Sequence, residues 1–357
     1  MLAWLYDEDR WPSGAAGGLV TQDERYRARC LLFTNTKIAA NYYSDDSCSE
    51  GGRSNKGTVI AAYDVRLDAE GNLLGSRRIG EDDAAEGEKW YAILEIHQPS
   101  SWYNDKTYAD TLNKAAIERF IEVTHEAYAK AVGDEFDKTV PAIFTDEPQF
   151  TRKKRLATGL AGPDTDVTLP WTDSVPEGFK AAYGYDLLDV LPEIFWERAD
   201  GAVSVHRYRY HDFITELFAA SFADTIGGWC FKHNISLTGH MMEEPSLRSQ
   251  SAAIGEAMRS YRGFGLPGID LLCNSHEFTT AKQCQSAVHQ FGREGMLSEL
   301  YGVTGWDCDF RTYKHQGDWQ ACLPGRDRAR AAPLVVRHAG RGQARLPGLH
   351  PLPEPLV

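Results

Sequence analysis

The sequence predicts an α/β fold, specifically an incomplete (β/α)₈ TIM barrel that holds about strands 2–7 and carries a small antiparallel β insertion near the amino terminus. From Asp105 onward, short apolar runs alternate with long amphipathic stretches, which is the pattern of a parallel sheet with crossover helices. Several of these runs end in a polar residue, and the loops after barrel strands build the active site. No glycine-rich phosphate loop follows any strand, which disfavours a doubly wound sheet.

The amino-terminal part combines one apolar strand with a β-rich insertion. Residues 1–6 (MLAWLY) are a predicted strand that runs into a charged turn at residues 7–10. Residues from about 31 to 89 hold short alternating runs separated by Gly, Asp and Asn, which is typical of antiparallel strands. The run at residues 90–97 is a candidate for the next barrel strand.

The rest of the chain alternates helices with strands. Asn113 is expected to cap a helix over residues 114–132. A polar loop follows Pro148 and runs to about Val175, and a second helical region covers about residues 192–233. The remaining predicted elements are strands at residues 140–145, 235–238, 268–273 and 295–298 and a helix at 280–291.

Composition limits the classes of function. The 357 residues carry a net charge of −13, which disfavours nucleic acid and anionic membranes as partners. No apolar stretch is long enough to span a bilayer, and no signal peptide opens the chain, so we expect a cytoplasmic protein. The seven cysteines include no CxxC pair and are expected to be reduced thiols.

The carboxy-terminal segment differs from the rest. Residues 323–357 contain six Arg and six Pro but no Lys and no aromatic residue, and the apolar periodicity stops there. We therefore divide the chain into a partial barrel at residues 1–321 and an aberrant tail at 322–357. The tail is expected to be disordered or translated in a shifted frame.

Two glutamates at predicted strand ends are the candidate catalytic residues. Hydrolysis of a glycosidic bond needs one carboxyl group that protonates the leaving oxygen and a second that attacks carbon or activates water. Glu147, in Asp146-Glu147-Pro148, follows one strand, and Glu299 follows another. A charged pair directly after a buried strand is costly unless it serves a site. The structural alternative for Glu147 is a salt bridge to Arg152 or Lys153.

Polar and aromatic side chains near other strand ends are candidate substrate contacts. Sugars present C–H faces to Trp and Tyr rings and hydroxyl groups to acids and amides. His240 and Glu243, in the HMMEE segment, are better candidates for hydroxyl contacts than for zinc ligands, because this segment follows a strand and precedes a proline. The full candidate set is Asp7, Glu8, Trp11, His97, Asp146, Trp171, His240, Glu243, Asn274 and Trp306.

Longer motifs resemble bacterial family 106-type α-L-rhamnosidases over roughly residues 1–321. These motifs are WLYDEDRWPSG at residues 4–14, FTDEP at 144–148, LSELYG at 297–302 and GWD at 305–307. The Asp-Glu-Pro motif is also similar to the Asn-Glu-Pro acid/base motif of barrel glycosidases that carry their carboxylates on strands four and seven.

The resemblance implies that Glu147 is the general acid and Glu299 the second carboxylate. It also implies a chain truncated at both ends, because the family's first and eighth strands have no counterpart. Asn-Glu-Pro glycosidases retain anomeric configuration, whereas the rhamnosidases are described as inverting and calcium-dependent. Carboxyl separation distinguishes the two, at about 5–5.5 Å for retention and about 6.5–9.5 Å for inversion. Apart from calcium implied in this way, we expect no cofactor.

Two alternatives remain open. The chain could be an inactive fragment or a non-catalytic carbohydrate-binding protein. It could also be a metal-dependent hydrolase that uses Asp146, His240 and Asp270.

Overall fold

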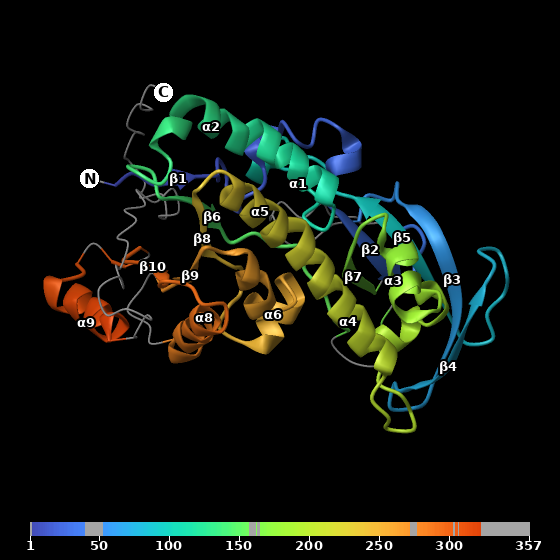
Figure 1. The fold of residues 1–357 in the computed structure, drawn as a ribbon. Helices are drawn as coiled ribbons and strands as arrows, with labels where there is room; N and C mark the ends of the chain where they lie inside the picture. Colours follow the sequence, from blue (N-terminus) through green and yellow to red (C-terminus); the bar gives the residue numbers. More distant parts are fainter. Residues whose placement is uncertain are drawn as a thin grey trace.

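The computed structural model of this chain describes residues 2–39, 53–156, 162, 165–271, 277–302, 304, 305 and 307–322. It has two five-stranded sheets, one at each end of the molecule (Figure 1). In the first sheet every pairing is parallel, in the order β1-β6-β8-β9-β10. Its strands are β1 (Leu5–Tyr6), β6 (Ala142–Asp146), β8 (Ser236–His240), β9 (Leu266–Asp270) and β10 (Leu297–Glu299).

The second sheet is antiparallel, in the order β4-β3-β5-β2-β7. Its strands are β2 (Arg29–Thr34), β3 (Thr58–Leu67), β4 (Leu73–Ile79), β5 (Glu88–Ile96) and β7 (Asp166–Trp171).

Helices connect the parallel strands and cover them. One continuous helix joins α1 (Lys114–Phe120) and α2 (Glu126–Val132) through a π-helical turn, and the Asn113 side chain caps it at the nitrogen of Ala115. A second long helix joins α4 (Val205–Phe218) and α5 (Thr225–Lys232) through another π-helical turn and runs diagonally from the antiparallel sheet to β8 (Figure 1). The other α-helices are α3 (Val175–Tyr183), α6 (Leu247–Ala253), α7 (Ala257–Ser260), α8 (Phe278–Gln290) and α9 (Phe310–Ala321). Short 3₁₀ turns lie at Ala16–Gly18, Glu24–Tyr26, Ser101–Tyr103, Gly133–Glu135, Leu187–Asp189, Leu191–Ile194 and Tyr261–Gly263.

The structure confirms a mixed α/β fold with a parallel sheet and a separate antiparallel one. Two strand assignments were wrong. The run at residues 90–97 belongs to β5, an inner strand of the antiparallel sheet, because its residues pair with both β2 and β3. The predicted loop before Val175 contains β7, which pairs with the far side of β2. Among the described residues the parallel strands form an open sheet with β1 and β10 at its edges, so the closed barrel stays a prediction.

Other expectations concern membranes and thiols. None of the helices in the described part of the chain is both long and apolar enough to cross a bilayer. The five cysteines in these residues are free, and Cys30, Cys230 and Cys284 are buried. Cys48, Cys273 and residues 323–357 lie outside the described residues.

Gly239 allows the central strands to come together just before a site residue. Its φ is +113°, a backbone conformation that residues with a Cβ rarely adopt. A Cβ at this position would lie 1.9 Å from the backbone oxygen of Thr145 on β6. This glycine therefore permits both the close strand approach and the backbone direction that leads into His240.

We expect Gly239→Ala to lower the free energy of unfolding by about 2 kcal/mol or more, because the methyl group meets backbone that cannot yield without disturbing β6. Urea unfolding followed by fluorescence measures this change. Gly228→Ala is the matched control, since a Cβ there meets nothing within 4 Å and alanine favours the helix. Equal stability of the two variants would contradict the assigned role of Gly239.

Candidate active site

The polar residues at the carboxyl ends of the parallel strands gather around one another. The register pairs Asp146 at the end of β6 with His240 at the end of β8, and Asp270 at the end of β9 with Glu299 at the end of β10. Glu147 follows β6 directly. Since parallel strands all present their carboxyl ends at one edge of the sheet, residues far apart in the chain form one cluster there.

His240 lies at the centre of this cluster and is 1% exposed. Its Nε2 is 2.8 Å from Oε2 of Glu299 and 3.9 Å from Oδ1 of Asp146. The edge of its ring meets Phe144, with the ring centroids 5.4 Å apart. Burial alone would lower the pKa of His240. The hydrogen bond to Glu299 and the charges of Asp270 and Asp146 outweigh burial and raise that pKa well above its usual value. A positive imidazolium therefore neutralises part of the surrounding negative charge.

Glu147 has the environment of a carboxylic acid that keeps its proton. Burial, opposed by the charge of His240 and reinforced by the charges of Asp270 and Asp146, raises its pKa to about 8. The indole nitrogen of Trp11 donates a hydrogen bond to Oε2 of Glu147 at 2.7 Å. The backbone of Glu147 has a φ of +44°, in the left-handed region that costs free energy for a residue with a side chain. Such strained residues concentrate at functional sites.

The segment after β1 fixes the end of β6. The backbone nitrogen of Asp146 donates to the Ser13 hydroxyl at 2.7 Å, and the backbone nitrogen of Ser13 donates to the oxygen of Asp146 at 2.8 Å. The hydroxyl of Tyr6 donates to the Asp146 carboxylate, and its ring stacks on Phe144. Residues of the WLYDEDRWPSG motif therefore hold the end of β6 from the side.

Asp270 and Glu244 extend the cluster. Burial raises the pKa of Asp270 to about 6, and its Oδ1 is a buried atom with no hydrogen-bond partner among the described residues. Its backbone nitrogen donates to Oε2 of Glu244 at 3.1 Å. Glu244 also accepts a hydrogen bond from the Tyr261 hydroxyl, and burial raises the pKa of Glu244 to about 7. Sequence reasoning singled out Glu243 in this segment and missed Glu244, although both are acids in one tight turn.

The geometry brings the two candidate catalytic residues to the same imidazole. Ligand-type atoms of Glu147, His240 and Asp270 all lie within 4.8 Å of one another, as do those of Asp146, His240 and Glu299. Glu147 and Glu299 thus approach one ring, which is compatible with the carboxyl separations of about 5–9.5 Å in glycosidases. Glu299 is the more deeply buried of the two, at 3% exposed.

The two sets of three residues, Glu147 with His240 and Asp270 and Asp146 with His240 and Glu299, are also the places in the described residues where an ion could be held. Calcium takes six to eight oxygen ligands. Here a hydrogen-bonded, cationic imidazole already stands between the carboxylates, so the residues do not fit calcium at the centre of the cluster. Two carboxylates and a neutral imidazole would suit zinc or manganese better, but each group contains only two of the three residues of the metal-dependent alternative, Asp146, His240 and Asp270.

The other predicted substrate contacts lie in different surroundings. Glu8 is half-buried and close enough to Tyr6 to raise the pKa of its hydroxyl. Glu243 forms an ion pair with Arg152, at the rim of the cluster. His97 contacts the Thr151 hydroxyl at 3.1 Å. Asn274 and Trp306 lie outside the described residues.

Two predicted contacts require correction. Trp171 was placed in a loop, but it belongs to β7, pairs with Arg29 and is 2% exposed within the main hydrophobic core. Asp7 is 3% exposed and turns away from the cluster, because strand residues alternate in direction and Tyr6 faces Asp146. Its oxygens meet the Ser13 hydroxyl at 2.5 Å and His125 at 3.8 Å.

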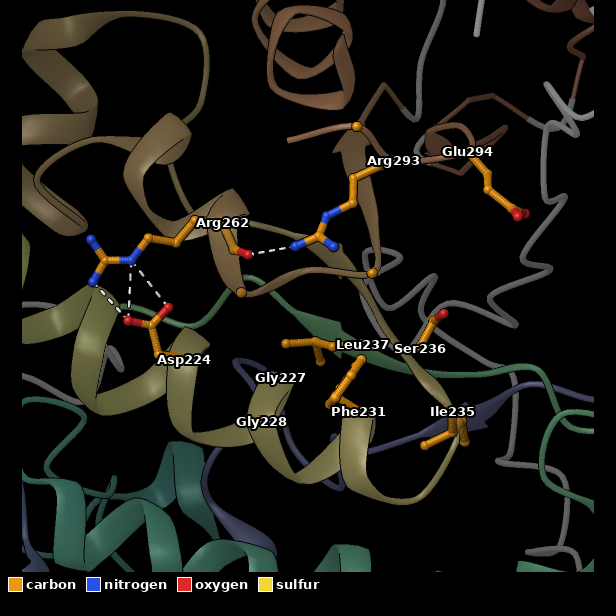
Figure 2. A pocket seen from close by; sticks show the side chains of 13 residues that line it. Asp224, Gly227, Gly228, Phe231, Ile235, Ser236, Leu237, Arg262, Arg293 and Glu294 are labelled. Atoms are coloured by element: carbon orange, nitrogen blue, oxygen red, sulfur yellow. Dashed lines mark hydrogen bonds and ion pairs between the residues drawn. The ribbon is translucent and has the colours of Figure 1, made fainter. Parts of the chain in front are cut away.

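A hollow of about 490 Å³ lies at the opposite end of the parallel strands (Figure 2). It is lined by Ile235 and Ser236 at the beginning of β8 and by the turns that precede β9 and β10. Arg262, on its wall, forms an ion pair with Asp224 at 2.7 Å. The hollow is therefore separate from the carboxylate cluster.

Comparison with known proteins gives one partial likeness. The sequence matches no family model, and no curated protein is similar to it. Among solved structures, the chain is similar to a rhamnosidase from Novosphingobium sp. PP1Y, with 12% identity and a TM-score of 0.47. The alignment covers 84% of this chain and 41% of that one, so this chain spans less than half the length of that structure. The residues of the site, rather than this likeness, support the function discussed below.

Asp7 provides a test of how burial raises the pKa of a carboxyl group near the cluster. Burial raises its pKa to about 8, so the folded state holds a proton that the unfolded state releases from about pH 4 upward. The free energy of unfolding should therefore fall as the pH rises from 5 to 8. We expect Asp7→Asn to weaken this fall and to be more stable than the parent at pH 8 by about 2 kcal/mol or more.

Urea unfolding at pH 5, 6, 7 and 8 measures this difference, with the exposed Asp105→Asn as the control. Glu147, Glu244 and Asp270 should contribute in the same direction in both variants, since burial also raises their pKa values. Parallel profiles for Asp7→Asn and the parent would contradict the burial of an ionisable group at this position.

Proposed function

We propose that this chain carries the site of a glycoside hydrolase, built on an arc of a (β/α)₈ barrel. Glu147 is the general acid, and Glu299 is the nucleophile or general base. The observation that carries the proposal is the convergence of these glutamates, from the ends of β6 and β10, on His240. Two carboxyl groups in unequal environments are what acid-assisted cleavage of a glycosidic bond requires.

Glu147 performs the first proton transfer. Because its pKa is raised to about 8, its carboxyl group holds a proton at neutral pH and can pass it to the leaving oxygen. His240 keeps a positive charge beside Glu299 and holds its carboxyl group through a hydrogen bond, in position to attack carbon or to orient water. The indole of Trp11 stabilises the Glu147 carboxylate that remains after the transfer.

Asp270 is the main competitor for the role of second carboxylate. It lies within 4.8 Å of Glu147 and is less buried than Glu299. The motif resemblance favours Glu299 and suggests an α-L-rhamnoside as substrate. Variants of both residues therefore belong in the first experiment.

We expect Glu147→Gln to lower kcat/KM on unactivated glycosides by about 10²-fold or more, because proton donation is lost. The kcat/KM on aryl glycosides with acidic leaving groups should fall less. Glu299→Ala should abolish turnover on both substrate types, whereas Asp270→Asn should leave more activity. A panel of paired methyl and 4-nitrophenyl glycosides that includes the α-L-rhamnosides measures these effects, with the exposed Glu294→Gln as the control.

Each other outcome of this panel favours a different function. Unchanged turnover in Glu147→Gln would remove it from the acid role, and loss in Asp270→Asn equal to that in Glu299→Ala would move the second role to Asp270. Sugar binding without turnover in the parent chain would favour a carbohydrate-binding protein. Activity that disappears with a chelator and returns with zinc would favour the metal-dependent hydrolase.

The pH profile tests the acid role of Glu147 independently. Activity should decline on the alkaline side near pH 8, as Glu147 loses its proton. Trp11→Phe removes a hydrogen bond that lowers this pKa, so the alkaline limb should move to higher pH, by up to about one unit. Trp319→Phe, which removes an indole hydrogen bond within α9, should leave the limb in place. If the alkaline limb of the pH profile stays in place in Trp11→Phe, the titration that causes this limb belongs to a group other than Glu147.

A further inference from the structure

Three side chains, those of Arg10, Trp11 and Trp102, form an indole cluster that adjoins the proposed acid. The Trp11 indole nitrogen donates to Oε2 of Glu147 at 2.7 Å. The Trp102 indole nitrogen donates to the backbone oxygen of Trp11, also at 2.7 Å, and the two rings meet edge to face with centroids 5.8 Å apart. All three side chains are half-buried. The indole cluster is therefore attached to the acid and still accessible to a ligand.

Two contacts fix the orientation of the Arg10 guanidinium. Its central carbon lies over the Trp102 ring, 4.8 Å from the ring centroid, and its Nε donates to the backbone oxygen of Trp102. These contacts engage neither of the two terminal amino groups of the guanidinium. An arginine presents these groups to a carboxylate as parallel N–H donors. The guanidinium is thus preorganised on the indole to receive a planar anion.

Three acids precede Arg10 directly in the chain, yet no carboxylate in the part of the chain that the structure describes forms an ion pair with it. Asp7 is buried and accepts a hydrogen bond from the Ser13 hydroxyl at 2.5 Å. Asp9 accepts one from the backbone nitrogen of Gly17, also at 2.5 Å. The positive charge of Arg10 therefore remains available for an anionic ligand.

We propose that Arg10 and Trp102 bind a uronic acid in the leaving group of the substrate. The inference rests on the proposed function, because it takes Glu147 as the acid that protonates the leaving oxygen. Trp11 attaches the indole cluster to this acid, whereas Glu299, which would act on the other sugar, is hydrogen-bonded to an imidazole instead. The C–H face of the uronic acid would pack on the indoles, and its carboxylate would accept hydrogen bonds from Arg10.

Calorimetric titration of the whole chain tests the proposal with two pairs of probes at constant ionic strength. Methyl glucuronide is compared with the neutral methyl glucoside, and methyl galacturonide with the neutral methyl galactoside. We expect at least one uronide to bind saturably and about tenfold or more tightly than its neutral counterpart. Arg10→Met, which keeps an unbranched side chain and removes the charge, should abolish this preference. Arg10→Lys, which keeps the charge and loses the parallel donors, should reduce it.

Arg209→Met is the matched control and should keep the preference of the parent chain. The Arg209 guanidinium is also half-buried and lies 5.4 Å from the centroid of the Tyr183 ring, but it belongs to α4 and not to the indole cluster. Equal affinity of the parent for both members of each pair would overturn the proposal, and this comparison requires no variant to fold. A preference that survives in Arg10→Met would also overturn it.

Turnover measurements distinguish the two sides of the bond and the two proposals. We expect Arg10→Met to lower kcat/KM about tenfold more for an α-L-rhamnoside of glucuronate than for 4-nitrophenyl α-L-rhamnoside. A loss confined to 4-nitrophenyl glucuronide would place the carboxylate on the sugar that is attacked and overturn the assignment to the leaving group. Uronide binding without any turnover would uphold the carboxylate site while the proposed function fails. Turnover without a preference for uronides would do the reverse.

Discussion

The candidate active site depends on the interaction between one buried imidazole and the carboxylates around it. Without a positive charge at His240, the acids at the ends of β6, β9 and β10 would repel one another in surroundings that screen charge poorly. His240 offsets part of this repulsion, and burial raises the pKa of Glu147 so that its carboxyl group holds a proton. The roles that we propose for Glu147 and Glu299 follow from how each is placed relative to this ring.

Keeping such a cluster together costs stability. Buried acids with raised pKa values and a glutamate in the left-handed region each disfavour the folded state. The aromatic core that joins Phe33, Trp90 and Trp196 lies in the antiparallel sheet and carries none of this strain. Strands of both sheets contribute to the main hydrophobic core, so this core packs against the sheet that carries the cluster as well.

Local sequence patterns predicted where helices and strands lie in the chain better than they predicted which strands pair with one another. The capped helix at residues 114–132 and the strands before Asp146, His240 and Glu299 follow from periodicity and end signals. The strand at residues 90–96 was given to the wrong sheet, since alternation does not reveal its partners. Glu244, Ser13 and Tyr6 were missed because their roles arise from tertiary contacts. Trp171 resembled a loop residue because its strand contains a proline.

The position of β7 links the two halves of the molecule. The antiparallel sheet takes four strands from residues before β6 and its fifth from residues after β6, so the chain leaves this sheet, builds the strand that leads into Glu147, and returns. The β-rich region is therefore not an excisable module. Removing residues 31–89 would delete most of β2, the strand with which β7 pairs among the described residues, and so release one end of the loop that follows Glu147. A change in the length of the hairpin between β3 and β4 would leave this pairing in place, whereas loss of the whole region would loosen the segment that follows Glu147.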